Sequence, residues 1–106
     1  MVEMSEIKRV AEKIATAANA EKVILFGSFA RGDFHTGSDV DLFIIAPSDL
    51  PRFKRSRKLY KLFSPYPFSM DLLVYTPEEV EAGKKTPLSF VSTVLREGKV
   101  VYDHRT

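Results

Sequence analysis

The stretch GSFARGDFHTGSDVDLFII, residues 27–45, contains the residues on which the predicted fold and function depend. Its last six residues, VDLFII, read as a buried strand because they are almost continuously apolar. Two carboxylates, Asp39 and Asp41, nevertheless stand where this strand begins. Side chains alternate along a strand, so both should point to the same side, with Cα atoms about 7 Å apart. Two like charges held side by side repel each other unless a cation lies between them.

A magnesium ion would supply this compensation, since it is a hard cation that takes oxygen ligands. The alternative is that both aspartates belong to the turn DFHTGS, residues 33–38, where Asp is a common turn residue. The position of Asp41 inside the apolar run favours metal binding.

A third acid, Asp71, lies in the strand-like segment FSMDLLVY, residues 68–75. Because a buried carboxylate without a partner costs several kcal/mol, we expect Asp71 to have one. If its strand lies beside the first, at a spacing of about 4.8 Å, three carboxylates converge on one spot. Such a set is typical of metal-assisted phosphoryl or nucleotidyl transfer. The alternative is a salt bridge between Asp71 and a lysine.

Gly27 and Ser28 join the predicted strand EKVILF, residues 21–26, to a single helical turn that ends at Gly32. The start of a helix offers free backbone N–H groups to a phosphate. Glycine lets the phosphate approach the backbone, and the serine adds a hydroxyl donor. Taken alone, a Gly-Ser turn is a weak signal; its place just before the aspartate pair strengthens it.

The remaining chain predicts further helices and strands around this stretch. Amphipathic spacing predicts a helix over 5–18, and start signals at Pro51, Thr76-Pro77 and Thr86-Pro87 predict helices over 51–63, 76–83 and 86–97. Strands are expected at 21–26, 40–46, 68–75 and 99–103. We therefore predict an α+β fold, a small mixed sheet of three to four strands flanked by helices.

Composition sets the broad class. The chain has 106 residues, 44% of them apolar and 28% charged, and it has no cysteine. These values predict a single folded domain over 1–106, without disulfides or thiolate metal sites. The apolar runs are too short to cross a membrane, so we expect a cytoplasmic protein. A net charge of +2 permits nucleic-acid binding without favouring it.

Together these residues resemble a known family. The pattern Gly27-Ser28-x-Ala30-Arg31-Gly32, a five-residue loop, and Ser38-Asp39-x-Asp41-Leu42 resembles the signature of the DNA polymerase beta nucleotidyltransferase superfamily. More narrowly, the chain is similar to its minimal nucleotidyltransferases (MNT), and Asp71 falls where that family carries its third carboxylate. The resemblance implies the DNA polymerase beta-like nucleotidyltransferase fold.

The resemblance also implies a mechanism. Asp39 and Asp41 would hold two Mg²⁺ ions on a nucleoside triphosphate, with ATP as the expected nucleotide. Gly27 and Ser28 would bind its β- and γ-phosphates. Asp71 would bind one metal ion and help to deprotonate an acceptor hydroxyl, which attacks the α-phosphorus and expels pyrophosphate.

Family members of this size imply a partner. Many work with a helical HEPN protein, and in one arrangement the HEPN protein is a toxin ribonuclease and the minimal nucleotidyltransferase is its antitoxin, which attaches AMP to a tyrosine. By resemblance, we expect an MntA-like antitoxin of this type. Two alternatives remain: a non-catalytic binding module that acts by complex formation, and nucleotidyl transfer to a small molecule.

Other residues of the signature, the basic segment and the aromatic residues also have expected roles. Arg31 either reaches a phosphate or pairs with Asp33, and Ser38 is expected to orient the loop before Asp39 by hydrogen bonding within the turn. We expect the basic segment 52–61 to be a solvated helix face; the alternative is that it binds an acidic partner surface or RNA. Its apolar residues, such as Phe53, are expected in the core, while Phe29 or Phe34 could pack beside a nucleobase.

Overall fold

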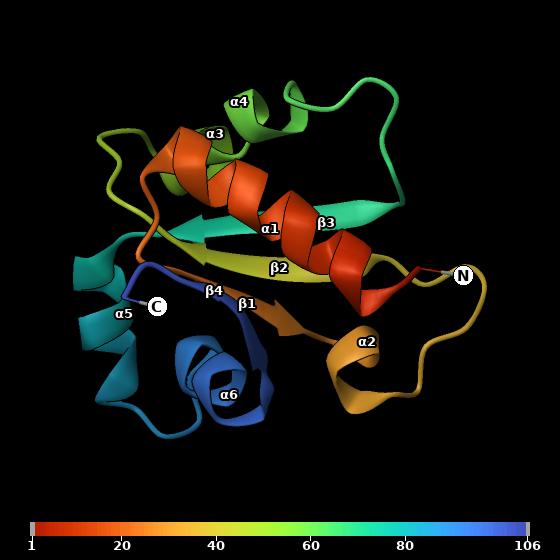
Figure 1. The fold of residues 1–106 in the computed structure, drawn as a ribbon. Helices are drawn as coiled ribbons and strands as arrows, with labels where there is room; N and C mark the ends of the chain where they lie inside the picture. Colours follow the sequence, from red (N-terminus) through yellow and green to blue (C-terminus); the bar gives the residue numbers. More distant parts are fainter. Residues whose placement is uncertain (1, 106) are drawn as a thin grey trace.

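Four strands form a mixed sheet in the order β3-β2-β1-β4 (Figure 1) in the computed structural model, which describes residues 2–105. The strands are β1 (Lys22–Phe26), β2 (Val40–Ile45), β3 (Met70–Tyr75) and β4 (Lys99–Asp103). Strand β1 pairs antiparallel with β2 and β4, whereas β2 and β3 run parallel. The predicted α+β class, with a small mixed sheet flanked by helices, is confirmed.

Helices cover both faces of this sheet. They are α1 (Met4–Ala18), α2 (Ser28–Arg31), α3 (Arg52–Arg55), α4 (Arg57–Tyr60), α5 (Pro77–Lys84) and α6 (Phe90–Glu97). Helix α1 lies across one face (Figure 1), where its buried residues and Leu59 of α4 join the core cluster. Helices α5 and α6 pack on the other face through Val80, Val91 and Val94. None of the helices within residues 2–105 is long and apolar enough to cross a membrane.

The central strand β2 sends its side chains alternately into these two cores. Val40, Leu42 and Ile44 are buried on the α1 side, and Phe43 and Ile45 on the α5/α6 side. Asp41 shares the side of Phe43, but it lies at the start of the strand and is the one residue of β2 that is not fully buried. The side chain of Asp41 is thus only partly buried, at one end of an otherwise buried strand.

Two predicted helices differ from the structure. The helix expected over 51–63 is two single turns, α3 and α4, that meet at Ser56. They are anchored differently, because Arg55 of α3 reaches toward β3 and Leu59 of α4 enters the core beneath α1. Phe53, expected in the core, is 71% exposed.

The last helix starts later than predicted. Helix α6 begins at Phe90, with Ser89 as N-cap accepting a hydrogen bond from Ser92 N, so that Thr86-Pro87 lies in the connecting turn. The Ser89 hydroxyl also donates to the Gly83 carbonyl, which fastens this start to the end of α5. By contrast, Thr76 caps α5 as expected, in a capping box with Glu79.

Candidate active site

The parallel pairing of β2 with β3 places Asp41 directly beside Asp71. On its other side, Asp41 is paired with Phe26 at the end of β1. Neighbouring strands are about 4.8 Å apart, so the two carboxylates stand on adjacent strands of the face that carries α5 and α6. The strand of Asp71 thus lies next to that of the aspartate pair, which is the condition on which the sequence argument for three neighbouring carboxylates depended.

The environment of Asp41 is unfavourable for a negative charge. Partial burial raises the pKa of its carboxyl, the charges of Asp71 and then Asp39 raise it further, and Arg31 opposes them. Arg31 is itself paired with Asp33, since its Nε lies 3.1 Å from Oδ2. Negative charge therefore gathers at this end of the sheet with little positive charge to offset it.

The expectation that Asp71 is buried was wrong. Asp71 is exposed at the start of the edge strand β3, so burial cannot be the reason for a partner. Among residues 2–105, no lysine or arginine forms an ion pair with it, and the salt bridge considered as an alternative is not seen.

Gly27 brings the turn after β1 against Asp41. Its backbone has φ 72° and ψ −153°, a conformation that suits glycine. A Cβ atom at this position would lie 2.1 Å from Asp41 Oδ2, so no larger residue fits without displacing the carboxylate. Ser28 follows as the first residue of α2, and Gly32 ends that turn in the left-handed region as predicted. The candidate phosphate turn and the candidate metal ligand are thus in contact.

The other predicted residues lie around this centre. Asp39 is exposed and accepts a hydrogen bond from the Ser69 hydroxyl, at the turn into β3. Ser38 stabilises its turn, as expected, because its hydroxyl accepts a hydrogen bond from His35 N at 2.9 Å. Ser69 was not singled out in the sequence, since only the fold brings it beside Asp39.

A divalent cation is the group that this chemistry implies. Within residues 2–105, no set of three or more His, Asp or Glu side chains is gathered as a ready metal site. The donor chemistry nevertheless fits, because Asp41 and Asp71 are cross-strand neighbours and both Asp71 and Asp39 raise the pKa of Asp41. The convergence of all three carboxylates on metal therefore stays a prediction.

Aromatic rings lie beside the carboxylates, and the sequence did not signal them. Phe90, at the start of α6, packs against Phe26, Phe43 and Tyr75, with ring centroids 5.6, 6.0 and 6.0 Å away. Phe90 remains 43% exposed. Since Phe26 pairs with Asp41, this cluster forms an apolar wall of the site. It depends on contacts between distant segments, which a local pattern cannot reveal.

Comparison with known proteins agrees with this geometry. Residues 7–66, more than half of the chain, match the nucleotidyltransferase domain family. The chain belongs to the nucleotidyltransferase domain family. The matched segment contains Gly27, Ser28, Asp39 and Asp41 but ends before Asp71, whose assignment rests on the register of β3.

Two archaeal relatives come from Methanocaldococcus jannaschii. The chain is 43% identical to "Putative protein adenylyltransferase MJ0141" over 54 residues, which is 51% of this chain and about half (54%) of that protein. It is 37% identical to "Putative protein adenylyltransferase MJ0604" over 82 residues, 77% of this chain and 78% of the relative.

Two solved structures share the fold. The crystal structure of a "putative nucleotidyltransferase from Sulfolobus solfataricus" matches with a TM-score of 0.68 at 21% identity, over 97% of this chain and 82% of that one. The "toxin-antitoxin with AMP-PNP" matches with a TM-score of 0.55 at 18% identity, over 92% and 74%. At these identities the likeness shows the nucleotidyltransferase fold alone.

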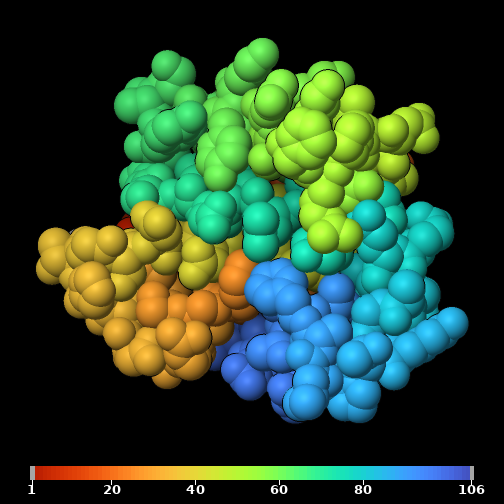
Figure 2. Space-filling model, turned by 180° about the vertical axis from the view of Figure 1, so that it is seen from behind, coloured from red at the N-terminus to blue at the C-terminus, as the bar shows by residue number. Residues whose placement is uncertain are grey.

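Two hollows border the candidate active site. One, of about 260 Å³, lies between Gly27, Arg31 and Phe90. The other, of about 500 Å³, is lined by the stacked rings of Phe29 and Phe34, 4.4 Å apart, and by Ser69. Figure 2 shows the face of α5 and α6, where residues 27–38, the segment around 50–66 and α6 surround the exposed part of β3.

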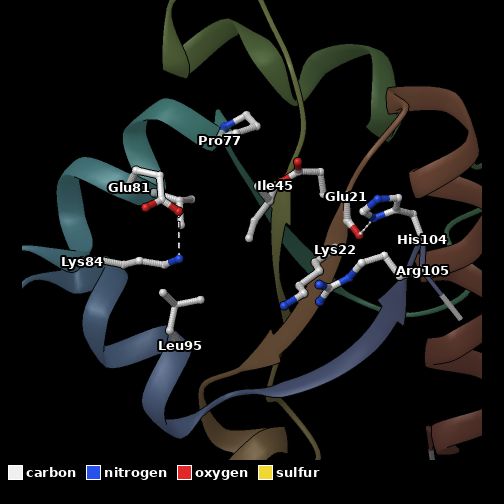
Figure 3. A pocket seen from close by; sticks show the side chains of 10 residues that line it. Glu21, Lys22, Ile45, Pro77, Glu81, Lys84, Leu95, His104 and Arg105 are labelled. Atoms are coloured by element: carbon white, nitrogen blue, oxygen red, sulfur yellow. Dashed lines mark hydrogen bonds and ion pairs between the residues drawn. The ribbon is translucent and has the colours of Figure 1, made fainter.

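A further hollow, of about 360 Å³, lies at the opposite end of the sheet (Figure 3). Lys22 and Ile45 line it, and they pair at the end of β1 and β2 that is farthest from Asp41. Lys84 forms an ion pair there with Glu81 at 2.9 Å. None of the three predicted catalytic aspartates lines this hollow, so it is separate from the candidate active site.

Proposed function

We propose that this nucleotidyltransferase transfers a nucleoside monophosphate, with AMP from ATP as the expected donor reaction, to a hydroxyl group of a protein partner. The observation that carries the proposal is the pairing of Asp41 with Asp71 across β2 and β3, next to the Gly27 turn. Both M. jannaschii relatives carry the name "Putative protein adenylyltransferase", which supports a protein acceptor.

The residues have distinct proposed roles. Gly27 and Ser28 bind the β- and γ-phosphates through the turn that opens α2, with Arg31 and Ser38 beside them. Asp39, Asp41 and Asp71 would hold Mg²⁺, with two ions expected, and bound Mg²⁺ would stabilise the charges on the attacking and leaving oxygens.

Asp71 has the best position to accept the proton of the acceptor hydroxyl. It is exposed on an edge strand, on the side of Asp41 away from Gly27, where an acceptor can approach. The attacking oxygen forms a bond to the α-phosphorus as the bond to the bridging oxygen of pyrophosphate breaks. Pyrophosphate then leaves from the side of Gly27, in line with the attack.

We further propose that residues 1–106 work as one nucleotidyltransferase domain and that the acceptor is a HEPN-type toxin, of which this chain is the antitoxin. A chain of the solved "toxin-antitoxin with AMP-PNP" shares this fold, which supports the idea. A purely binding antitoxin remains the second candidate. The uncompensated charge at Asp41 favours catalysis over it, because a site used only for docking would not need three acids.

The test uses ATP labelled at the α-phosphate, MgCl₂, the purified chain and the protein encoded beside it. Asp39→Asn and Asp41→Asn are the test variants, and Asp49→Asn, an exposed acid in the loop after β2, is the matched control. We expect label on the partner with the wild type and the control, and none with either test variant. If wild type and variants inhibit the toxic activity of the partner equally and no label appears on the partner, the result would favour the binding antitoxin.

A further inference from the structure

Positive charge is concentrated in one segment beside the proposed acceptor side. Residues 50–66 contain no acidic residue and six of the 16 basic residues of the chain, namely Arg52, Lys54, Arg55, Arg57, Lys58 and Lys61. The rest of the chain carries the other 10 basic residues and all 14 acidic ones. The small net charge of the protein therefore hides a strongly basic segment on an otherwise acidic molecule.

Only part of this charge is used within the molecule. Arg55 Nη1 lies 2.6 Å from Glu79 Oε1, and Arg52 Nη2 lies 3.4 Å from Glu79 Oε2. The other four cations are exposed and form no ion pair with any residue in 2–105: Lys54, Arg57, Lys58 and Lys61. These four cations, on α3, on α4 and at the C-cap of α4, are therefore available to bind an acidic surface.

Apolar side chains are exposed among these cations. Phe53 is 71% exposed, Tyr66 56% and Leu50 43%. The anchors of protein–protein interfaces are enriched in aromatic residues and Arg, and this segment offers Phe53, Tyr66 and Arg57. We name residues 50–66 the basic rim.

The basic rim is held rigidly against the edge of the sheet. Arg55 Nε donates to Leu50 O at 2.8 Å and its Nη1 to Val74 O at 3.2 Å, and the side chain is only 9% exposed. Tyr60 Oη accepts a hydrogen bond from Leu72 N at 2.9 Å. Two backbone groups of the edge strand are thereby already bonded, so a partner docks here through side chains rather than as an added strand.

The basic rim borders the carboxylate that faces the acceptor. Leu72, which is bonded to Tyr60, directly follows Asp71 in β3, and the Arg52 guanidinium lies 4.2 Å from the centroid of Tyr75, the last residue of that strand. Figure 2 shows this yellow-green and green segment along the upper side of the strand. A protein bound to the rim would present its surface beside Asp71.

We propose that the basic rim docks an acidic, partly apolar segment of the acceptor protein and so brings the acceptor hydroxyl to Asp71. This inference rests on the proposed function and deepens it by naming the chemistry of the partner. RNA is the competing occupant for a basic surface. An acidic protein is favoured because the aliphatic Leu50 accompanies the aromatic residues, and an aliphatic side chain provides no stacking surface for a base.

The test measures binding and transfer separately. The triple variant Lys54→Glu/Arg57→Glu/Lys58→Glu lowers the net charge of the basic rim from +6 to zero without changing Arg55 or a core residue. Binding is followed by fluorescence anisotropy with three probes: a synthetic peptide with one tyrosine among Glu and Asp residues, the same peptide with Lys at each acidic position, and a single-stranded RNA oligonucleotide.

The matched control is Lys8→Glu/Lys85→Glu/Lys99→Glu, which makes the same change in net charge at exposed positions outside the rim. We expect the acidic peptide to bind the wild type and the control variant alike, and the rim variant at least about tenfold more weakly. Equal binding by the rim variant, or tighter binding of RNA or of the basic peptide by the wild type, would overturn the proposal.

Transfer from α-labelled ATP to the acidic peptide separates this proposal from the proposed function. We expect the rim variant to raise KM for the peptide by about tenfold and to leave kcat and the affinity for MgATP unchanged. Rim-dependent binding of the peptide, with no label on either the peptide or the partner protein, would refute transfer to protein while the docking surface stands. Labelling that is equally efficient in the rim variant would refute the docking surface while the function stands.

Discussion

Replacing Asp41 by Asn should stabilise the metal-free protein, although it removes a residue of the proposed active site. The amide keeps the shape of the carboxyl group but not its charge. In the wild type, burial and the charges of Asp71 and Asp39 raise the pKa of Asp41, which means that its ionised form is disfavoured in the folded state. Removing that charge relieves the repulsion.

The size of the effect follows from the register. Asp41 and Asp71 are direct partners on adjacent strands, so their carboxylates are about 5 Å apart. Two unit charges at that distance interact by about 0.8 kcal/mol in water and about 3 kcal/mol at an effective dielectric constant of 20. Because Asp71 is exposed, we take about 1 kcal/mol, which corresponds to a rise in Tm of roughly 4 °C for a domain of this size.

Urea unfolding with and without divalent cation tests this reasoning. In EDTA, Asp41→Asn should be more stable than the wild type by about 1 kcal/mol, and Asp49→Asn should be unchanged. With MgCl₂ and a non-hydrolysable ATP analogue at about 100 times the Kd, the wild type should gain about 2.7 kcal/mol and overtake the variant. Lower stability of Asp41→Asn in EDTA, or an equal gain with MgCl₂, would refute the argument.

Three further predictions concern the turn, the metal and the anchor of the basic rim. Gly27→Ala should abolish nucleotidyl transfer because its Cβ would displace Asp41. Gly32 has a similar φ of 83° but open space around it, so Gly32→Ala should lose only about 1–2 kcal/mol of stability. Equal activity of the two variants would contradict the contact between Gly27 and Asp41. EDTA should abolish transfer and MgCl₂ restore it, and activity that persists in EDTA would exclude the metal assignment. The pKa of Glu79 is lowered to about 2, chiefly by its hydrogen bond from Arg55. The ionised Glu79 therefore stabilises the fold at pH values above its unfolded-state pKa of 4.5, and this stabilisation is lost as the pH falls toward 2. Urea unfolding over that pH range should show about 2 kcal/mol less acid destabilisation in Glu79→Gln than in the wild type, after allowance for solvent screening, and parallel curves would contradict it.

Local signals in the sequence predicted much of the fold. The apolar spacing of residues 5–18 matches α1, and the pair Thr76-Pro77 marks the start of α5, where Thr76 and Glu79 form a capping box. Gly32 ends α2 with positive φ, as a C-terminal glycine should. Each of these features depends on residues within one or two helical turns, which is the range over which sequence patterns act.

Long-range contacts decided the rest. The pairing of Asp41 with Asp71 depends on a parallel register between two strands joined by a long crossover. The exposure of Asp71 at the start of β3 depends on how the surrounding elements pack on the sheet. Phe90 could not be placed beside Phe26, because α6 packs there only once the sheet has formed. Likewise, Ser89 rather than Thr86 caps α6, since its hydroxyl also reaches Gly83 O on the preceding helix.

The most direct test of the central claim is the intact mass of the partner protein after incubation with MgATP and either wild type or Asp71→Asn. We expect wild type to add the mass of one or more adenylyl groups to the partner and Asp71→Asn to add none, while both bind the partner. An unchanged mass with the wild type, a gain of phosphoryl mass, or full adenylylation by Asp71→Asn would contradict the assignment of Asp71 and Asp41 to a nucleotidyl-transfer site.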